Sequence, residues 1–205
     1  KISTETKDSR GVVYKEQIQY VGDIIAGDRT SVETAMVDRN ILAPPLKTEK
    51  RFRPENGTEK LFGGEQTEFG LFNNLILPAA FRKACLDQPT SAPLFQSSLY
   101  TDTELTYDLY DKKGNILQTT AKDGKKTIYI WGYGGLYLIG KVENTTLAKV
   151  KGISGLSSFF STITHSVVRN IPAIEAAFSK ATRATFAGST TPAACRFSYT
   201  SVRAL

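Results

Sequence analysis

The sequence contains few of the residues that build catalytic and metal sites. Of its 205 residues, two are cysteine, one is histidine, one is methionine and one is tryptophan. Structural zinc sites need four cysteine or histidine ligands in close pairs, and Cys85, Cys195 and His165 do not supply them. His165 also has no cysteine or acid nearby in sequence that would orient it as a general base. No cofactor or metal is expected, and the protein is predicted not to be an enzyme.

Long apolar runs are lacking as well. No segment approaches the roughly 18 consecutive apolar residues that a membrane-spanning helix requires, so no membrane span is expected. The chain starts at Lys1 without an initiator methionine or the pattern of a signal peptide, and it ends within an extended segment. We therefore expect a piece of a longer chain. Cys85 and Cys195 could form a disulfide, but two buried thiols are the favoured interpretation.

The positive charge is confined to one part of the chain. Its 26 Lys plus Arg and 20 Asp plus Glu give a net charge of +6. Residues 144–205 contain seven basic residues and a single acid, Glu175, so residues 1–143 are neutral. Binding to nucleic acid requires several basic residues along one groove. Because the seven are dispersed and no base-stacking pattern accompanies them, a solvated helix face is favoured and no nucleic-acid partner is expected.

Strands separated by turns dominate the first two thirds of the chain. Alternating apolar and polar residues indicate half-buried strands, and glycine-closed polar turns indicate hairpins. The pair Asn56-Gly57 is typical of a hairpin in which both residues take a positive φ. Strands are expected at residues 12–21, 47–53, 105–110, 115–120 and 127–131.

Helical patterns occur in two places. A short helix is expected near residues 31–42, where Ser31 or Thr30 can cap the start, Glu33 lies in the first turn and Pro44-Pro45 enforces a stop. After residue 150, apolar residues recur at helical spacing. Pro172 suits the first turn of a second helix, which gives a helical hairpin near 153–186.

Together these patterns predict a mainly β fold with a helical insertion, of the α+β class. A β-hairpin region is expected over residues 1–150, including the short helix at 31–42. The helical insertion is expected at 151–190, and residues 191–205 read as a strand that resumes the sheet.

Residues 107–118, Tyr-Asp-Leu-Tyr-Asp-Lys-Lys-Gly-Asn-Ile-Leu-Gln, carry a recognisable motif. The segment resembles the YD repeat of bacterial RHS-type proteins, in which a Tyr-Asp pair precedes a glycine and an apolar strand. Tyr110, Asp111 and Gly114 hold these positions. In such a turn we expect the ring to pack on a neighbouring strand, the aspartate to cap the turn and the glycine to close it with a positive φ.

The segments 131–150 and 36–46 are similar to a subgroup of large RHS-like surface proteins of Gram-negative bacteria. This resemblance implies stacked antiparallel β-hairpins that form a curved sheet. One departure is that Pro54-Glu55 stands where a second Tyr-Asp pair would fall. Complete members build hollow shells, some of which enclose a toxin, but this chain is too short to close a shell and no toxin activity is implied. The residues expected to serve the repeat structurally are Tyr110, Asp111, Gly114, Gly124, Trp131, Gly132 and Tyr133.

The function implied by the resemblance is a non-catalytic structural and interaction segment of a secreted or cell-surface protein, extracellular or associated with the outer membrane. Its expected partners are other repeats of the same polypeptide or a partner surface protein. The alternative is a carbohydrate- or ligand-binding module, with a glycan as partner. That module would use aromatic side chains that share one strand face, although packing in the core is the favoured role for them: Tyr129, Trp131, Tyr133 and Tyr137. Asp108 and Asp111 could pair as in glycosidases, but turn chemistry is the favoured interpretation.

Overall fold

The computed structural model describes residues 2–152 and 197–199. Contacts divide the chain into two compact units, Lys1–Thr106 and Tyr107–Leu205, and the boundary between them falls inside one strand, β6 (Asp102–Tyr110). The helical insertion expected near residues 153–186 lies outside the described residues. The same applies to His165 and Cys195. The region boundaries expected at residues 150 and 190 stay predictions.

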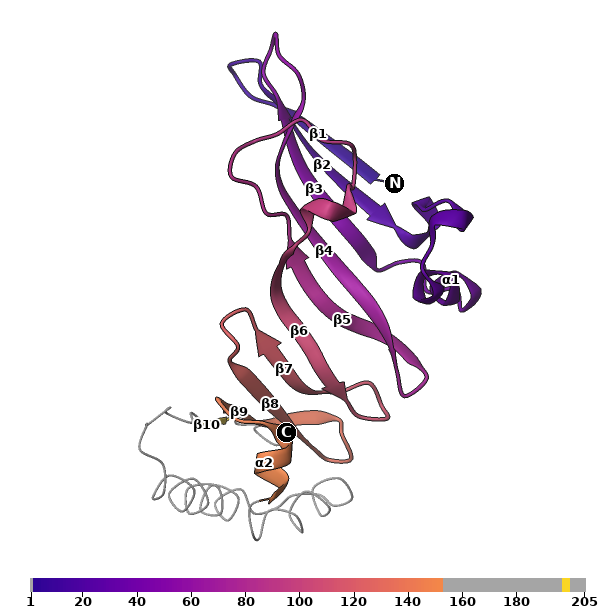
Figure 1. Ribbon diagram of the computed structural model, residues 1–205, viewed down its shortest axis with the longest axis vertical. Coiled ribbons are helices and arrows are strands. Elements are labelled where there is room, and N and C mark those ends of the chain that lie inside the picture. The colour runs from indigo at the N-terminus through magenta and orange to yellow at the C-terminus, as the bar shows by residue number, and fades with distance from the viewer. Residues whose placement is uncertain (1, 153–196, 200–205) are drawn as a thin grey trace, which may run out of the picture. The chain divides into compact units, whose positions relative to one another are not determined.

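Within each unit the strands follow one another in chain order, and each hairpin lies beside the next (Figure 1). Every strand pair with a described register is antiparallel. The first unit contains β1 (Ile2–Lys7), β2 (Val13–Tyr20), β3 (Pro45–Arg53), β4 (Lys60–Phe72), β5 (Leu75–Lys83) and the start of β6 (Asp102–Tyr110). The second unit contains the end of β6, then β7 (Ile116–Ala121), β8 (Lys126–Gly132), β9 (Tyr137–Glu143) and β10 (Phe197–Tyr199). The prediction of a mainly β fold of stacked hairpins is therefore confirmed.

The expected short helix is α1 (Ser31–Asp38). Thr30 caps it: its Oγ1 accepts a hydrogen bond from Glu33 N at 3.2 Å, and the Glu33 carboxylate accepts one from Thr30 N at 2.7 Å. The helix ends before residue 42 because Asn40 takes a left-handed φ of 57°. The Ile41 amide then donates to Met36 O and the Asn40 amide to Val37 O, which is a Schellman ending. The stop is thus made by Asn40, ahead of the proline pair.

The helix covers one end of the first unit's sheet with an apolar cluster. Met36 of α1 is fully buried against Val21, Leu46 and Ile76. Val21 belongs to the short 3-10 helix η1 (Val21–Asp23), which with η2 (Ala26–Asp28) leads from β2 into α1. Burial of a side chain such as Met36 contributes on the order of 1.5–3 kcal/mol, so this cluster fixes α1 on the sheet.

Three hairpins have the same type of turn. In each, a backbone amide donates to the carbonyl four residues further along the chain, and a glycine with a left-handed φ closes the loop. In the β1–β2 hairpin, Asp8 N donates to Val12 O at 2.9 Å and Gly11 N to Asp8 O at 3.1 Å. The β6–β7 turn repeats this pattern at residues 111–115, and the β7–β8 turn repeats it at 121–125. The glycines have φ values of 80°, 88° and 79°. This is the three-residue hairpin loop with a glycine bulge.

The remaining turns of the first unit are built differently. Gly57 N donates to Pro54 O at 3.1 Å, but neither Asn56 nor Gly57 takes a positive φ, so the expected conformation of that pair is wrong. The loop to β4 is longer than two residues, and Pro54 fixes its own φ in the negative range. The β4–β5 hairpin instead turns on Asn73 and Asn74, whose φ values of 49° and 66° fit a type I′ turn.

The second unit is packed around β8. Ile128, Ile130 and Val142 are at most 3% exposed, and Ile128 lies opposite Val142 in the β8–β9 register. A helix, α2 (Leu147–Gly152), follows β9. Its first amide, Leu147 N, donates to the side-chain oxygen of Gln118 on β7 at 2.9 Å. This hydrogen bond joins the helix to the sheet at its start.

Candidate functional site

A long connection, residues 84–101, crosses one face of the first unit between β5 and β6, and we call it the strap. It is joined to β4 by the pair Leu61 and Thr90, whose amides and carbonyls bond reciprocally at 2.8 and 3.0 Å. Cys85 is the second residue of the strap, and its amide donates to Leu99 O at 2.9 Å. Its side chain is exposed, so the expectation of a buried thiol is wrong for this residue, which lies in a surface connection and not in a strand of the core.

Alternate residues of β3 hold the strap in place. Glu49 and Arg51 form an ion pair, with Arg51 Nη2 at 2.8 Å from Glu49 Oε2, and they are 0% and 4% exposed. Arg51 also donates to Ala92 O and Pro93 O at 2.9 and 3.0 Å. The other carboxylate oxygen of Glu49 accepts from Phe95 N at 2.8 Å. The pair therefore satisfies strap groups that would otherwise be buried without partners.

Lys47 is the third strand residue on this face. Its Nζ donates to Phe95 O at 3.0 Å and to Ser97 Oγ at 2.7 Å, and it lies 5.3 Å from the centre of the Tyr100 ring. Burial lowers the pKa of Lys47, although Glu33, Glu49 and Glu68 act in the opposite direction. Burial, the charge of Glu49 and a hydrogen bond to it raise the pKa of Tyr100 well above its usual range. Lys47 thus fixes the C-terminal end of the strap on the sheet, through Phe95, Ser97 and Tyr100.

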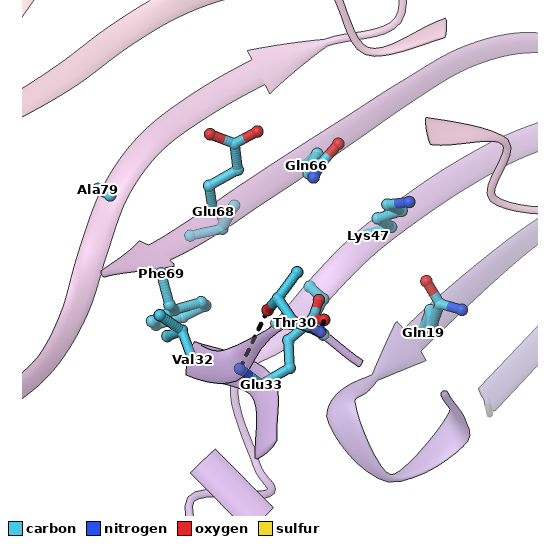
Figure 2. A pocket seen from close by; sticks show the side chains of 11 residues that line it. Gln19, Thr30, Val32, Glu33, Lys47, Gln66, Glu68, Phe69 and Ala79 are labelled. Atoms are coloured by element: carbon cyan, nitrogen blue, oxygen red, sulfur yellow. Dashed lines mark hydrogen bonds between the residues drawn. The ribbon is translucent and has the colours of Figure 1, made fainter. Parts of the chain in front are cut away.

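A hollow of about 330 Å³ lies between α1 and the sheet, with Lys47 on its wall (Figure 2). The sheet contributes both apolar and polar side chains to its lining, and the polar residues Gln19, Lys47 and Gln66 lie opposite one another on three neighbouring strands. Two of its acids are already engaged. Glu33 caps α1, and Glu68 bonds to Arg82 at 2.9 Å. The hollow can hold small polar molecules, but its groups do not form a nucleophile with a base.

The described residues contain neither a metal-binding cluster nor a membrane-spanning helix. Within residues 2–152 and 197–199, no three His, Cys, Asp or Glu side chains gather where they could hold a metal ion. None of the helices described there is long and apolar enough to cross a bilayer.

The Tyr-Asp motif forms the β6–β7 turn. Asp111 Oδ1 accepts from Lys113 N at 2.8 Å and from Asn115 N at 2.9 Å, and Gly114 has a φ of 88°. Tyr110 is 8% exposed, and burial raises its pKa to about 12, with a smaller effect from Tyr107. Asp111 thus caps this turn and Gly114 closes it, while the Tyr110 ring stacks on Tyr107 of its own strand, with ring centres 6.2 Å apart. The role of these residues in a repeat stays a prediction. Asp8 caps the β1–β2 turn in the same way, through Arg10 N and Val12 N at 2.9 Å each.

The motif turn also contacts the loop between β8 and β9. Asn115 Nδ2 donates to Asp111 Oδ2 and to Gly135 O, both at 2.9 Å, and the Lys113 ammonium bonds to Gly134 O. In that loop Tyr133, Gly134 and Gly135 take positive φ values of 53°, 68° and 85°. Three left-handed residues in succession turn these carbonyls toward the neighbouring hairpin. The β6–β7 turn thereby fixes the conformation of the β8–β9 loop. The spacing of the motif residues does not predict this contact.

The four aromatic residues of 129–137 do not form one exposed row. Tyr129 and Trp131 are half-buried, and Trp131 Nε1 donates to Ile116 O at 2.7 Å across the sheet. Tyr133 and Tyr137 pack edge to face at the loop, with ring centres 5.6 Å apart. Tyr137 is the most exposed of the four, at 51%. Gly132 is buried, and a methyl group there would lie 2.9 Å from the Ile139 side chain.

The two acids of the hydrolase alternative have separate partners. Asp108 Oδ2 accepts from Gln118 Nε2 at 2.8 Å and from Thr120 Oγ1 at 2.6 Å, and Lys126 Nζ lies 3.7 Å away. Asp111 is used by the turn. Gly124, the remaining motif residue, closes the β7–β8 turn, where Asp123 Oδ1 accepts from Lys125 N at 2.9 Å.

The chain matches no protein-family model, no curated protein and no solved structure. The likeness to RHS-type proteins therefore stays a proposal that rests on the motif residues. The roles of Glu49 and Arg51 are not predicted from the sequence. Their signal was available in the alternation Lys47, Glu49, Arg51 along one strand face, but charged residues at that period normally indicate a solvated face.

Proposed function

We propose that this chain is a non-catalytic scaffold and interaction segment of a secreted or cell-surface protein of the RHS/YD-repeat type. The observation that carries the proposal is the turn shared by the β1–β2, β6–β7 and β7–β8 hairpins. Its function would be mechanical: each hairpin supplies the edge on which the next one is laid.

The shared turn supports a repeat because it goes beyond a glycine in each loop. Asp8 and Asp111 accept from the same two amides, two and four residues further along the chain. Glycine turns are common in any β protein, but this side-chain cap recurs in both compact units. The two turns are thus copies of one local design.

The edge of the first unit supports an interaction role. All residues of β1 are exposed, and among the described residues β1 pairs with β2 alone. An unpaired edge presents amide and carbonyl groups that can template another strand. Ile2, which is 53% exposed at this edge, would be covered by such a strand. The proposed partner is therefore another hairpin of the parent polypeptide or a strand of a partner surface protein.

Hydrogen exchange tests this proposal. In the 205-residue chain, the outward amides of β1 should exchange as fast as unstructured peptide, whereas those bonded to β2 should be protected. In the natural product that contains this segment, the outward amides should be slow as well. Fast exchange of the outward amides in both forms would overturn the idea that the edge is joined.

The intact mass of the natural product provides an independent test. An antibody raised against residues 1–152 should recover a secreted or surface protein much heavier than the 22.5 kDa of this chain. Recovery of a monomeric 22.5 kDa protein with every sheet edge covered would contradict the scaffold proposal.

A further inference from the structure

An aromatic cluster lies on the open face of the first unit. Tyr14 and Phe52 are opposite one another on β2 and β3, and Phe62 of β4 packs against both. Its ring centre lies 6.5 Å from that of Tyr14 and 5.9 Å from that of Phe52, at interplanar angles of 85° and 63°. Tyr14 and Phe62 are 38% and 43% exposed. The edge-to-face packing holds the rings rigidly while part of their surface stays accessible.

A β-bulge places Phe62 on this surface. In the β3–β4 register, Arg51 lies opposite Leu61 and Lys50 opposite Gly63, so Phe62 is the extra residue. A bulge redirects a side chain relative to the regular alternation of a strand, and bulges are frequent beside functional sites. The sheet therefore breaks its register at the point where the exposed ring is placed.

Two glycines follow the ring, and only one of them has a packing reason. A methyl group on Gly64 would lie 3.1 Å from the Tyr100 ring, so the strap requires that glycine. A methyl group on Gly63 would meet no atom within 4 Å, and Gly63 has no positive φ. Glycine inside a strand costs about 0.5–1 kcal/mol relative to alanine. Such a residue often marks a place where a ligand approaches the backbone closely.

Gly63 lines a hollow of about 300 Å³ together with Phe62, Gly64 and Ala84, and we call these apolar residues its floor. The polar residues of the lining, which we call its rim, are Thr48, Lys50, Glu65 and Lys83. The volume is at the lower end of the range for small-ligand sites. The floor and the ring give the hollow an apolar base, and the rim offers both hydrogen-bond donors and acceptors.

The charges of the rim are balanced within the sheet. Lys83 lies opposite Glu65 in the β4–β5 register and 3.8 Å from Glu104, and Lys50 lies opposite Glu16 on β2. An ion of either sign would meet a group of like charge here. An uncharged ligand with many hydroxyl groups and an apolar face fits both the ring and the rim.

We propose that the hollow formed by Phe62, Gly63 and the rim of Thr48, Lys50, Glu65 and Lys83 binds a neutral saccharide. The C–H face of a pyranose ring stacks on the electron-rich face of Phe62, and its hydroxyl groups bond to the rim. Gly63 lets the sugar approach the strand without a side chain in between. This inference does not depend on the repeat assignment, because it rests on contacts within the first unit.

The test is a titration of the complete 205-residue chain with four neutral tetrasaccharides, built from β-linked glucose, α-linked glucose, mannose and N-acetylglucosamine. Backbone amide resonances report the site of binding. At least one of the four should shift the Gly63 and Glu65 amides in a saturable way. A heparin tetrasaccharide, which is strongly anionic, should bind more weakly than that neutral ligand.

Two variants separate binding from stability. Phe62→Ala removes the stacking ring, and Gly63→Val fills the floor with a side chain that the strand accommodates; each should weaken binding about tenfold or more. Gly63→Val keeps the test valid if Phe62→Ala fails to fold. Phe62→Tyr should bind as the parent does, and Leu71→Ala, at a 58% exposed apolar residue of the same strand, is the matched control.

Several results would overturn the proposal. One is that no tetrasaccharide shifts the Gly63 amide at millimolar concentration, and another is that Gly63→Val binds as well as the parent. Preferential binding of the anionic probe would also contradict it. Loss of binding in Trp131→Ala but not in Phe62→Ala would place the site on the aromatic residues of the second unit.

Discussion

Glu49 and Arg51, two residues apart on β3, form a buried ion pair with a distance of 2.8 Å between Oε2 and Nη2. The pair lies on the sheet face that the strap covers, and each partner also bonds to the strap. Burying two charges costs free energy, and that cost is repaid only when geometry and hydrogen bonding are complete. Here both conditions hold, so the pair determines where the strap lies.

Replacing Arg51 by methionine should be among the most destabilising single changes in the first unit. The Glu49 carboxylate would remain buried without a counter-charge, and we expect a loss of about 3–5 kcal/mol in the free energy of unfolding. Urea unfolding measures it. The double variant Glu49→Gln/Arg51→Met should recover part of the loss because no buried charge remains. Arg10→Ala, at an exposed ion pair with Asp8, should change stability by less than about 0.5 kcal/mol.

Stability should decrease at alkaline pH because of buried tyrosines. Burial raises the pKa of Tyr110 to about 12 and that of Tyr100 still further, whereas an unfolded chain loses these protons near pH 10. A raised folded-state pKa contributes stability that is complete below the unfolded pKa and is lost as the pH rises through the folded pKa. The free energy of unfolding should therefore fall above about pH 10.

Lysines titrate in the same pH range as these tyrosines. Substitution of the tyrosines shows how much of the alkaline decrease in stability they cause. Tyr100→Phe and Tyr110→Phe should each reduce the fall in the free energy of unfolding above about pH 10. The phenolate absorbance of each variant should show one group fewer that titrates with a raised pKa. A pH profile identical to that of the parent chain in both variants would show that these hydroxyl groups do not control the decrease.

Gly114→Ala tests the turn of the Tyr-Asp motif. At a φ of 88° an alanine Cβ is strained, and we expect a loss of about 1–2 kcal/mol. Gly27→Ala is the matched control, because that glycine has no positive φ and a methyl group there meets nothing within 4 Å. Thermal unfolding of the two variants should differ by several degrees. Equal unfolding temperatures would mean that the glycine is not required by the turn.

Trp131→Phe separates packing from ligand binding in the second unit. The hydrogen bond from Nε1 to Ile116 O is lost and leaves that carbonyl without the partner, so stability should fall by about 1–3 kcal/mol. An aromatic ring that only stacks on a ligand would tolerate this change. Unchanged stability together with reduced saccharide binding would favour a ligand role for Trp131 over its structural one.

Much of the local structure could be predicted from the sequence because it depends on neighbouring residues. The alternation of 12–21 and the cap formed by Thr30 and Glu33 are confirmed as β2 and the start of α1. The end of α1 was misplaced. Asparagine tolerates the left-handed region, and this ends the helix at Asn40 before the prolines can. Similarly, Asn73 and Asn74 form a hairpin turn, although the sequence pattern predicts such a turn only at the pair Asn56-Gly57.

Five of the strands, the glycine-closed turns and the cap of the motif turn are predictable from the sequence, because each arises within a few residues along the chain. Which side of β3 is covered depends instead on contacts with residues far along the chain. Lys47, Glu49 and Arg51 read as a solvated stripe until the strap, some forty residues further on, supplies their carbonyl and amide partners. The two neighbouring glycines of β4 are likewise distinguished only by the fold. Tyr100 of the strap covers Gly64, whereas Gly63 lies open beside Phe62.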